Sequence, residues 1–202
     1  MKVCVEVESK LELDFCGFNL LLSSGEMVRK VDQLNIYYDQ SWQLADQSST
    51  FRVRFARSES PRVTLKDAQV WEGGRRTTRE IEASLYELGF GQFKPPKQIE
   101  VLHLPRELSE PLMSHGISTL IRVGWVRNHR YVIQMHGYGM IELDCLKLPD
   151  GRNFFEVEIE EENTFLHQRL VEHVRSIVPN AQRSTLSKFE RFRAAVVNSG
   201  YR

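Results

Sequence analysis

The first residues of the chain place two carboxylates and one ammonium group on the same side of a predicted strand. Glu6, Glu8 and Lys10 stand at alternate positions, and valines occupy the odd positions from 3 to 7. Successive side chains of a strand point to opposite faces, so one face is charged and the other is apolar. Carboxylate oxygens are ligands that magnesium and manganese prefer, and lysine forms charge-assisted hydrogen bonds with phosphate oxygens. This spacing suits a site that holds a polyanion together with a divalent cation.

The same separation of apolar and charged faces recurs in later segments. Phe51, Val53 and Phe55 alternate with two arginines, and acids farther along the chain alternate with apolar residues in the same way. The solvated face of an antiparallel sheet is a common alternative for any single strand. Such a face is usually a polar mixture, whereas here bases gather on some strands and acids on others, which favours one shared cavity. The charged faces carry Arg52, Arg54, Lys66, Glu80, Glu82, Glu142, Asp144, Glu156 and Glu158.

Alternation predicts strands over much of the chain. A capping box of Ser23 and Glu26 predicts a helix that continues to residue 34. Apolar stripes predict further helices at 83–88, 106–115 and 165–178, and another that begins near residue 185. The predicted strands are residues 2–14, 34–39, 51–56, 62–67, 76–84, 119–126, 130–135, 139–145 and 153–161, with a hairpin near residues 129–130.

These elements predict an α+β fold. A conventional small barrel points its apolar faces inward and needs no helices outside. Here helices with apolar stripes are available to cover the apolar faces from outside, which leaves the charged faces to line an interior. We therefore expect a closed antiparallel β-barrel of about eight strands that forms a charged tunnel, with helices packed outside. Residues 1–202 are expected to form a single domain.

Composition narrows the classes of function. The 27 basic residues balance the 27 acidic ones, so no global charge points to nucleic acid or to an anionic membrane. Lys2, Glu6 and Glu8 lie where a signal peptide needs an apolar segment, and the three cysteines fit neither a disulfide framework nor a zinc motif. We expect a cytoplasmic protein, monomeric or dimeric, that binds a small molecule and neither nucleic acid nor membrane.

Short charged motifs follow one another along nearly the whole chain. They are Glu6-x-Glu8-x-Lys10, Ile36-Tyr37-Tyr38-Asp39, Arg52-Val53-Arg54, Thr64-Leu65-Lys66, Arg79-Glu80-Ile81-Glu82, Arg122 with Trp125, Leu143-Asp144, Phe155-Glu156-Val157-Glu158 and Ser187-Lys188-Phe189. The first motif alone is weak because alternating charges are common. The ordered set is specific, and it resembles the CYTH superfamily, the triphosphate tunnel metalloenzymes.

The resemblance implies metal-dependent hydrolysis of a triphosphate, either inorganic tripolyphosphate or a small organic triphosphate such as thiamine triphosphate. It implies that Tyr37 pairs with Lys10, and that Glu80 and Glu82 bind a second metal or orient the attacking water. The residues implied to hold the triphosphate oxygens are Lys10, Arg52, Arg54, Lys66, Arg122 and Lys188. Those implied to hold Mg²⁺ or Mn²⁺ are Glu6, Glu8, Glu156 and Glu158, with Asp144 as a further or water-mediated ligand.

Some positions depart from the family pattern. Asp39 precedes Gln40-Ser41 where the family usually has Thr-Pro, and Ile121 stands where a second basic residue often precedes Arg122. These departures leave the choice of substrate open. Two other functions stay in view: an adenylyl cyclase that converts ATP to cyclic AMP, and a non-catalytic polyphosphate-binding module. The intact acids at 6, 8, 156 and 158 disfavour the module, and no residue clearly marks a nucleobase site.

Overall fold

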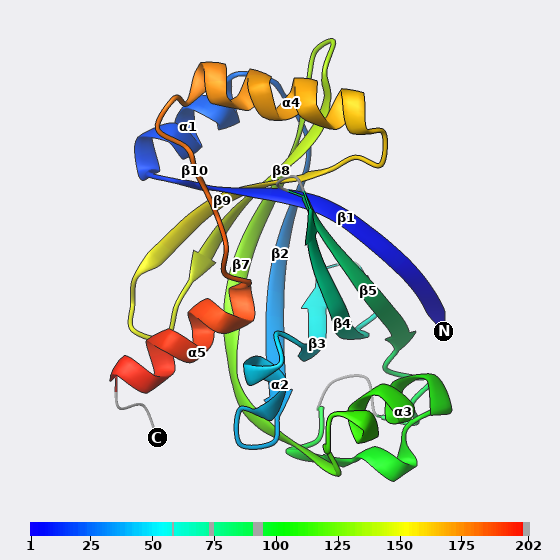
Figure 1. Ribbon diagram of the computed structural model, residues 1–202. Coiled ribbons are helices and arrows are strands. Elements are labelled where there is room, and N and C mark those ends of the chain that lie inside the picture. Colours follow the sequence, from blue (N-terminus) through cyan, green and yellow to red (C-terminus); the bar gives the residue numbers. More distant parts are fainter. Residues whose placement is uncertain (58, 73–74, 91–94, 200–202) are drawn as a thin grey trace.

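The strands form one antiparallel sheet that closes on itself. The structure, a computed structural model, describes residues 1–57, 59–72, 75–90 and 95–199. Within these ranges the strand order is β10-β1-β5-β4-β3-β2-β7-β8-β9, and β9 pairs with β1 to close a barrel of eight strands (Figure 1). The predicted closed α+β barrel is therefore confirmed. The barrel strands are β1 (Lys2–Leu13), β2 (Glu26–Asp39), β3 (Thr50–Ala56), β4 (Arg62–Glu72), β5 (Arg75–Ser84), β7 (Thr119–Met135), β8 (Gly139–Lys147) and β9 (Asn153–Glu160), while the short β6 (Gln98–Glu100) pairs with β7 and β10 (Gln182–Arg183) with β1.

Helices cover the apolar outer faces of the barrel, as the sequence predicts. On one half, Leu170 of α4 is buried against Val157 of β9, together with Leu21 of α1. On the other half, Leu108 of α3 is buried in a cluster with Leu65 of β4. Full burial of one such side chain contributes about 1.5–3 kcal/mol, so these clusters fix which face of each strand points outward. The helices are α1 (Phe15–Ser23), α2 (Gln43–Asp46), the 3₁₀ turn η1 (Val101–His103), α3 (Arg106–Ser114), α4 (Thr164–Ile177) and α5 (Lys188–Ser199). Among the described residues, no helix is both long enough and apolar enough to cross a membrane.

The helix predicted after Ser23 is wrong. The chain is helical before this residue, in α1, and Glu26 begins the long strand β2. The helix cap lies at Asp14, whose side chain accepts a hydrogen bond of 2.6 Å from the backbone N–H of Gly17. From Val31 onward, buried and exposed residues alternate in β2, and near the end of the strand the residues of both faces are buried. This burial pattern is typical of a strand, and pairing of β2 with β3 and β7 stabilises it.

Two further predictions at strand ends are also wrong. β5 continues to Ser84 and the following residues form turns, so the segment 83–88 is not a helix. The predicted break near residues 129–130 is absent, because β7 runs without interruption and pairs with β2 on one side and β8 on the other.

Part of the apolar face of β1 is uncovered. Val3 and Val5 are 53% and 62% exposed, although the sequence predicts that helices cover the valine face. β9 pairs with β1 only from Glu8 onward, so α1 and α4, which lie over β9 and the second half of β1, do not reach these valines (Figure 1).

Candidate functional site

The register of the strands brings the charged faces to one cavity inside the barrel. Lys10 is opposite Glu158 in the β1–β9 pair, and Lys66 is opposite Glu80 in the β4–β5 pair. Paired residues of neighbouring strands share a face, so the alternating charges all point inward. The cavity has a volume of about 210 Å³. Of the sequence-predicted site residues, it is lined by Glu6, Lys10, Tyr37, Arg52, Arg54, Lys66, Glu80, Glu82, Glu158 and Lys188.

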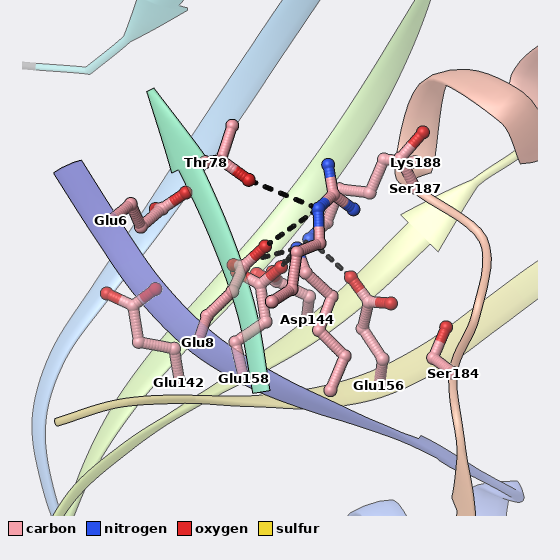
Figure 2. A network of polar contacts seen from close by, with 12 residues as sticks. Glu6, Glu8, Thr78, Glu142, Asp144, Glu156, Glu158, Ser184, Ser187 and Lys188 are labelled. Carbon is pink, nitrogen blue, oxygen red and sulfur yellow. Dashed lines mark hydrogen bonds and ion pairs between the residues drawn. The ribbon is translucent and has the colours of Figure 1, made fainter. Parts of the chain in front are cut away.

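Three predicted metal ligands lie buried directly beside the cavity. Glu8, Asp144 and Glu156 are each no more than 1% exposed. Figure 2 shows their carboxylates converging with that of Glu158, with Lys188 entering from the other side. The oxygens of Asp144, Glu156 and Glu158 lie within 4.8 Å of one another. The structure thus brings together acids that are up to 150 positions apart in the sequence, as the strand patterns predict.

Lys188 reaches these acids because of the way α5 begins. Ser187 and Glu190 form a capping box: the Ser187 backbone N–H donates to Glu190 Oε2 over 2.7 Å, and the Glu190 N–H donates to Ser187 Oγ over 3.2 Å. Lys188 is therefore the first helical residue. Its Nζ lies 2.8 Å from Asp144 Oδ2 and 2.7 Å from Glu158 Oε1, and it also contacts Glu156. These carboxylates raise the pKa of Lys188 well above its usual value despite the opposing effect of burial, so this lysine is a permanent cation.

Arg130 is a member of the site that the sequence analysis did not assign. Its Nε donates to Asp144 Oδ1 over 2.9 Å and its Nη2 to Oδ2 over 2.6 Å, and the guanidinium also contacts Glu142 and Glu158. Burial alone would raise the pKa of Asp144, but Arg130 and Lys188 outweigh it and lower the pKa to about 2. Arg130 pairs with Asp144 in the β7–β8 ladder, and this pairing places its side chain on the cavity face. The predicted break in β7 at this residue hid that position from the sequence analysis.

A second group of acids lies close together where β1, β8 and β9 meet. Burial, together with Glu142, Glu158 and Glu6, raises the pKa of Glu160 to about 8. Within the described residues neither buried oxygen of Glu8 accepts a hydrogen bond, although Lys10 Nζ lies 3.1 Å from Oε2 and Arg76 Nε 3.7 Å from Oε1. The oxygens of Glu6, Glu8 and Glu160 approach within 4.8 Å of one another, as do those of Glu142, Glu158 and Glu160. Such crowded carboxylates offer the oxygen ligands that a hard divalent cation prefers.

Glu142 and Glu160 were not among the predicted ligands. Glu142 was placed on a charged face without a role, and Glu160 continues the alternation of Glu156 and Glu158 on the same strand. The sequence alone favours a solvated strand end for Glu160, so the alternation does not by itself predict that this acid joins the cluster. The cluster of acids is therefore wider than the set of ligands that the resemblance implies.

The crowding of Glu160 predicts a pH-dependent change in stability. Its folded-state pKa of about 8 lies above the ordinary value of 4.5, so between these values the folded protein retains a proton that the unfolded chain has lost. This group therefore lowers the stability as the pH rises through that window. Without metal, Glu160→Gln is expected to raise the melting temperature more at pH 8 than at pH 5. Scanning fluorimetry in the presence of a chelator measures these melting temperatures. Glu162→Gln, at an exposed acid just beyond the strand, is the control. Equal shifts of the melting temperature of Glu160→Gln at the two pH values would contradict the prediction.

The opposite wall of the cavity is basic and lacks acid partners. Arg52 is only 8% exposed, and among the described residues its guanidinium forms no ion pair and its buried Nε has no hydrogen-bond partner. Arg54 Nε donates to the neutral Asn35 Oδ1 over 2.9 Å. Burial, and then the nearby Arg52 and Arg130, lowers the pKa of Arg54 to about 9. Buried cations without counter-charges are costly, so this wall is built for an anion.

Lys66 and its partners lie between the two walls. Lys66 Nζ lies 2.5 Å from Glu6 Oε2 and also contacts Glu80. Burial would raise the pKa of Glu80, but Lys66 and Arg52 lower it below the usual value, so Glu80 is ionised. Glu82 is half-buried, and its Oε2 lies 3.5 Å from Arg62. Neither Glu80 nor Glu82 joins a cluster of three acids among the described residues, so the geometry does not bring them to a second group of metal ligands.

Tyr37 lines the cavity but does not pair with Lys10. Its ring packs against Phe189 and Phe192, at 4.9 and 5.2 Å between centroids, and its buried hydroxyl has no hydrogen-bond partner within the described chain. Lys10 instead contacts Glu8 and Glu158. Burial raises the pKa of Tyr37, so the hydroxyl keeps its proton and is a donor available to a ligand.

The structure does not bring Arg122 to the cavity. A register shift in the β2–β7 ladder pairs Tyr37 with Gly124 but Tyr38 with Arg122. Tyr37 points inward, whereas Tyr38 is buried in the outer cluster, so its partner Arg122 shares the outer face, where it is exposed. The bulge inserts one extra residue and reverses the direction of the side chains beyond it. The expected contact of Arg122 with the triphosphate does not fit this geometry.

Comparison with known proteins places this barrel in a family. The fold and the site together define the class of this protein: a closed antiparallel barrel with an ionic interior. The family model described as the CYTH domain matches residues 5–193, so the chain belongs to the CYTH family. None of the curated proteins matches the sequence.

Solved structures share the fold. A putative adenylyl cyclase from Hippeastrum, described as having a dominant triphosphatase activity, is 24% identical with a TM-score of 0.75, over 94% of this chain and 95% of that one. A putative adenylate cyclase from Bacillus halodurans is 24% identical with a TM-score of 0.68, over 95% and 99% of the two chains. The Mimivirus capping enzyme triphosphatase is 11% identical with a TM-score of 0.51, over 87% and 90%. At these sequence identities, the similarity shows a shared fold and nothing more.

Proposed function

We propose that this chain is a divalent-metal-dependent triphosphatase that hydrolyses inorganic tripolyphosphate or a small organic triphosphate such as thiamine triphosphate. The supporting observation is the opposite charge imbalance of the two cavity walls. Among the described residues Arg52 and Arg54 form no ion pair with an acid, while Glu160 is crowded by Glu142, Glu158 and Glu6, which raise its pKa. One ligand offsets both imbalances: a polyanion that carries a divalent cation. CYTH relatives described as triphosphatases agree with this proposal.

The side chains divide into binding and catalytic roles. Arg52, Arg54 and Lys66 bind phosphate oxygens from the basic wall, as expected of charge-assisted donors. Lys10 and Lys188 stand between this wall and the acids, where they offset charge that grows on the transferring group. The carboxylates of Glu6, Glu8, Glu142, Glu158 and Glu160, with Asp144 and Glu156 behind them, are the proposed metal donors. A bound Mg²⁺ or Mn²⁺ would polarise the phosphoryl oxygens.

The lining favours a compact phosphate chain over a nucleotide. Tyr37 and Phe189 are the aromatic residues among the described lining, and they pack on each other. The remaining lining is charged or carries hydroxyl groups, which offers no apolar slot for a base. We therefore rank inorganic tripolyphosphate first among the substrates.

A substrate panel tests the proposal. Purified protein is incubated with tripolyphosphate, thiamine triphosphate, ATP or pyrophosphate, each with Mg²⁺ or Mn²⁺, and both phosphate release and cyclic AMP are followed. We expect phosphate release from tripolyphosphate that a chelator abolishes. Cyclic AMP as the main product would favour the cyclase alternative. Tight binding of tripolyphosphate without turnover under any metal would favour the binding module, and both results would overturn the proposal.

Arg52→Ala is expected to act mainly on binding. A charge-assisted hydrogen bond contributes about 1.5–3 kcal/mol, so KM for tripolyphosphate should rise about tenfold or more while kcat changes less. Arg122→Ala is the matched control, because Arg122 is exposed on the outer face and its loss should leave both constants unchanged. Steady-state kinetics decide: an equal effect of the two substitutions would contradict the assignment of the basic wall.

A further inference from the structure

A groove lies where α5 meets β7 and the turn that follows β8. In Figure 1, α5 lies beside the lower half of β7, whereas α4 lies at the top. The groove has a volume of about 360 Å³, which is within the range of small-molecule sites. Its walls include Val123, Trp125 and Arg127 of β7, Lys147 and Pro149 at the turn, and Val196 of α5. Among the described residues, none lines both this groove and the barrel cavity.

The groove owes its shape to close packing of α5 on β7 at Gly124. This residue has a φ of +151°, and a Cβ atom there would lie 2.5 Å from Phe192 Cζ, so a larger residue would displace the Phe192 ring. Phe192 itself is buried in the core and offers little surface to a ligand. The accessible apolar surface of the groove comes instead from Trp125, which is 54% exposed, and from the partly buried Val123 and Pro149.

Two cations lie next to each other beside this apolar surface. Arg127 and Lys147 are paired across the β7–β8 ladder, and both are exposed and line the groove. Like charges directly opposite each other in a sheet are destabilising. Within the described residues, neither side chain forms an ion pair or donates a hydrogen bond, so no acid offsets the two charges. An anion that contacts both side chains would remove this repulsion.

The position of Arg127 leaves its hydrogen-bond donors available. Its Cζ lies over the Trp125 ring, 5.9 Å from the centroid, which is a cation–π contact. The five N–H groups of a guanidinium lie in its own plane, so contact of its flat face with a ring does not occupy them. Arg127 can therefore bind an anion with two parallel hydrogen bonds, while the Lys147 ammonium adds a second positive charge.

We propose that this groove binds a small aromatic anion, a molecule whose aromatic ring carries a carboxylate, sulfonate or phosphate group. The anionic group pairs with Arg127 and Lys147, and the ring packs on Trp125 and the apolar wall beside it. A neutral ring would leave the two cations unpaired, and an anion without a ring would leave the apolar wall in water. Both parts of the ligand are therefore needed for full affinity. The site is separate from the proposed catalytic centre and does not depend on the proposed activity.

2-Naphthoate serves as the probe, with neutral 2-naphthalenemethanol and acetate as its matched analogues. NMR follows the indole N–H of Trp125, assigned through Trp125→Phe, while each compound is titrated into the protein. Because Trp125 does not line the barrel cavity, this signal reports on the groove. We expect a saturable shift with 2-naphthoate that weakens at high salt. Each analogue should bind about tenfold more weakly or worse, since each lacks either the charge-assisted contacts or the apolar contact.

Arg127→Gln combined with Lys147→Gln tests the two cations. Both positions are exposed, so the melting temperature should not fall, while the affinity for 2-naphthoate should fall about tenfold or more. Arg122→Gln is the matched control, because Arg122 is also an exposed arginine of β7 but does not line the groove, and it should leave the affinity unchanged. The proposal is overturned by the absence of a saturable shift, by equal affinity for either analogue, by unchanged affinity of the double variant, or by an equal loss in the control.

Discussion

Glu8→Gln is expected to abolish measurable turnover while the barrel stays folded. Glu8 is 1% exposed, neither of its oxygens accepts a hydrogen bond from the described residues, and it belongs to an acid cluster with Glu6 and Glu160. Glutamine keeps the shape but removes the charge that a divalent cation needs. The expected loss in kcat is at least about 10²–10³-fold, the effect of removing one electrostatic contact to a transition state. Metal affinity should fall by more than the roughly 10- to 100-fold typical of outer-shell changes.

The fold should survive because the neighbouring cations keep other partners. Lys10 remains in contact with Glu158, and Arg76 Nε still donates to Thr78 Oγ1 over 3.2 Å. Circular dichroism and the melting temperature in chelator check this, while Mn²⁺ titration and kinetics on tripolyphosphate measure function. Glu162→Gln, an exposed acid at the end of β9, is the control and should leave both unchanged. Full activity of Glu8→Gln, or activity of the natural chain that resists a chelator, would contradict the proposed metal role.

Strict alternation made the barrel predictable from sequence. Phe51, Val53 and Phe55 of β3 alternate with two arginines, and residues 155–160 of β9 alternate between apolar residues and glutamates. Both the core face and the cavity face of these segments therefore follow from period two. Because the strands pair in register, residues such as Lys10 and Glu158 meet although 148 positions separate them. The local sequence therefore predicts which face of each strand is apolar. Which strands lie next to one another can be seen only in the folded structure.

The errors arose where local pattern and pairing disagree. A one-residue bulge near Gly124 turns Arg122 outward, and nothing in the spacing of the flanking residues announces it. The Ser-x-x-Glu pattern is present at both Ser23 and Ser187, yet of these two only Ser187 caps a helix. At the first, pairing of β2 with two neighbours outweighs the weak local preference. The charge balance of Glu160 likewise depends on acids from three strands, which only the closed barrel assembles.

Lys10→Ala is expected to lower kcat far more than it raises KM. Lys10 lies 3.1 Å from Glu8 Oε2, contacts Glu158 and lines the cavity, so its ammonium stands where the proposed metal donors meet the phosphate. The two carboxylates raise its pKa above the usual value despite burial, so it is charged throughout the working pH range. A fixed cation there stabilises charge that grows as the phosphoryl bond breaks. The expected fall in kcat is about 10²–10³-fold.

Lys66→Ala is the matched comparison for Lys10→Ala. Lys66 is a partly buried lysine of the cavity held by two acids, Glu6 and Glu80, but it belongs to the binding wall and its loss should mainly raise KM. Steady-state kinetics on tripolyphosphate and thiamine triphosphate separate the two effects. Mn²⁺ titration of Lys10→Ala should show metal still bound, because the acids remain, which excludes metal loss as the cause of a low kcat. If Lys10→Ala keeps a near-normal kcat on the better substrate, Lys10 is only part of the binding surface, and the catalytic role assigned to it here is wrong.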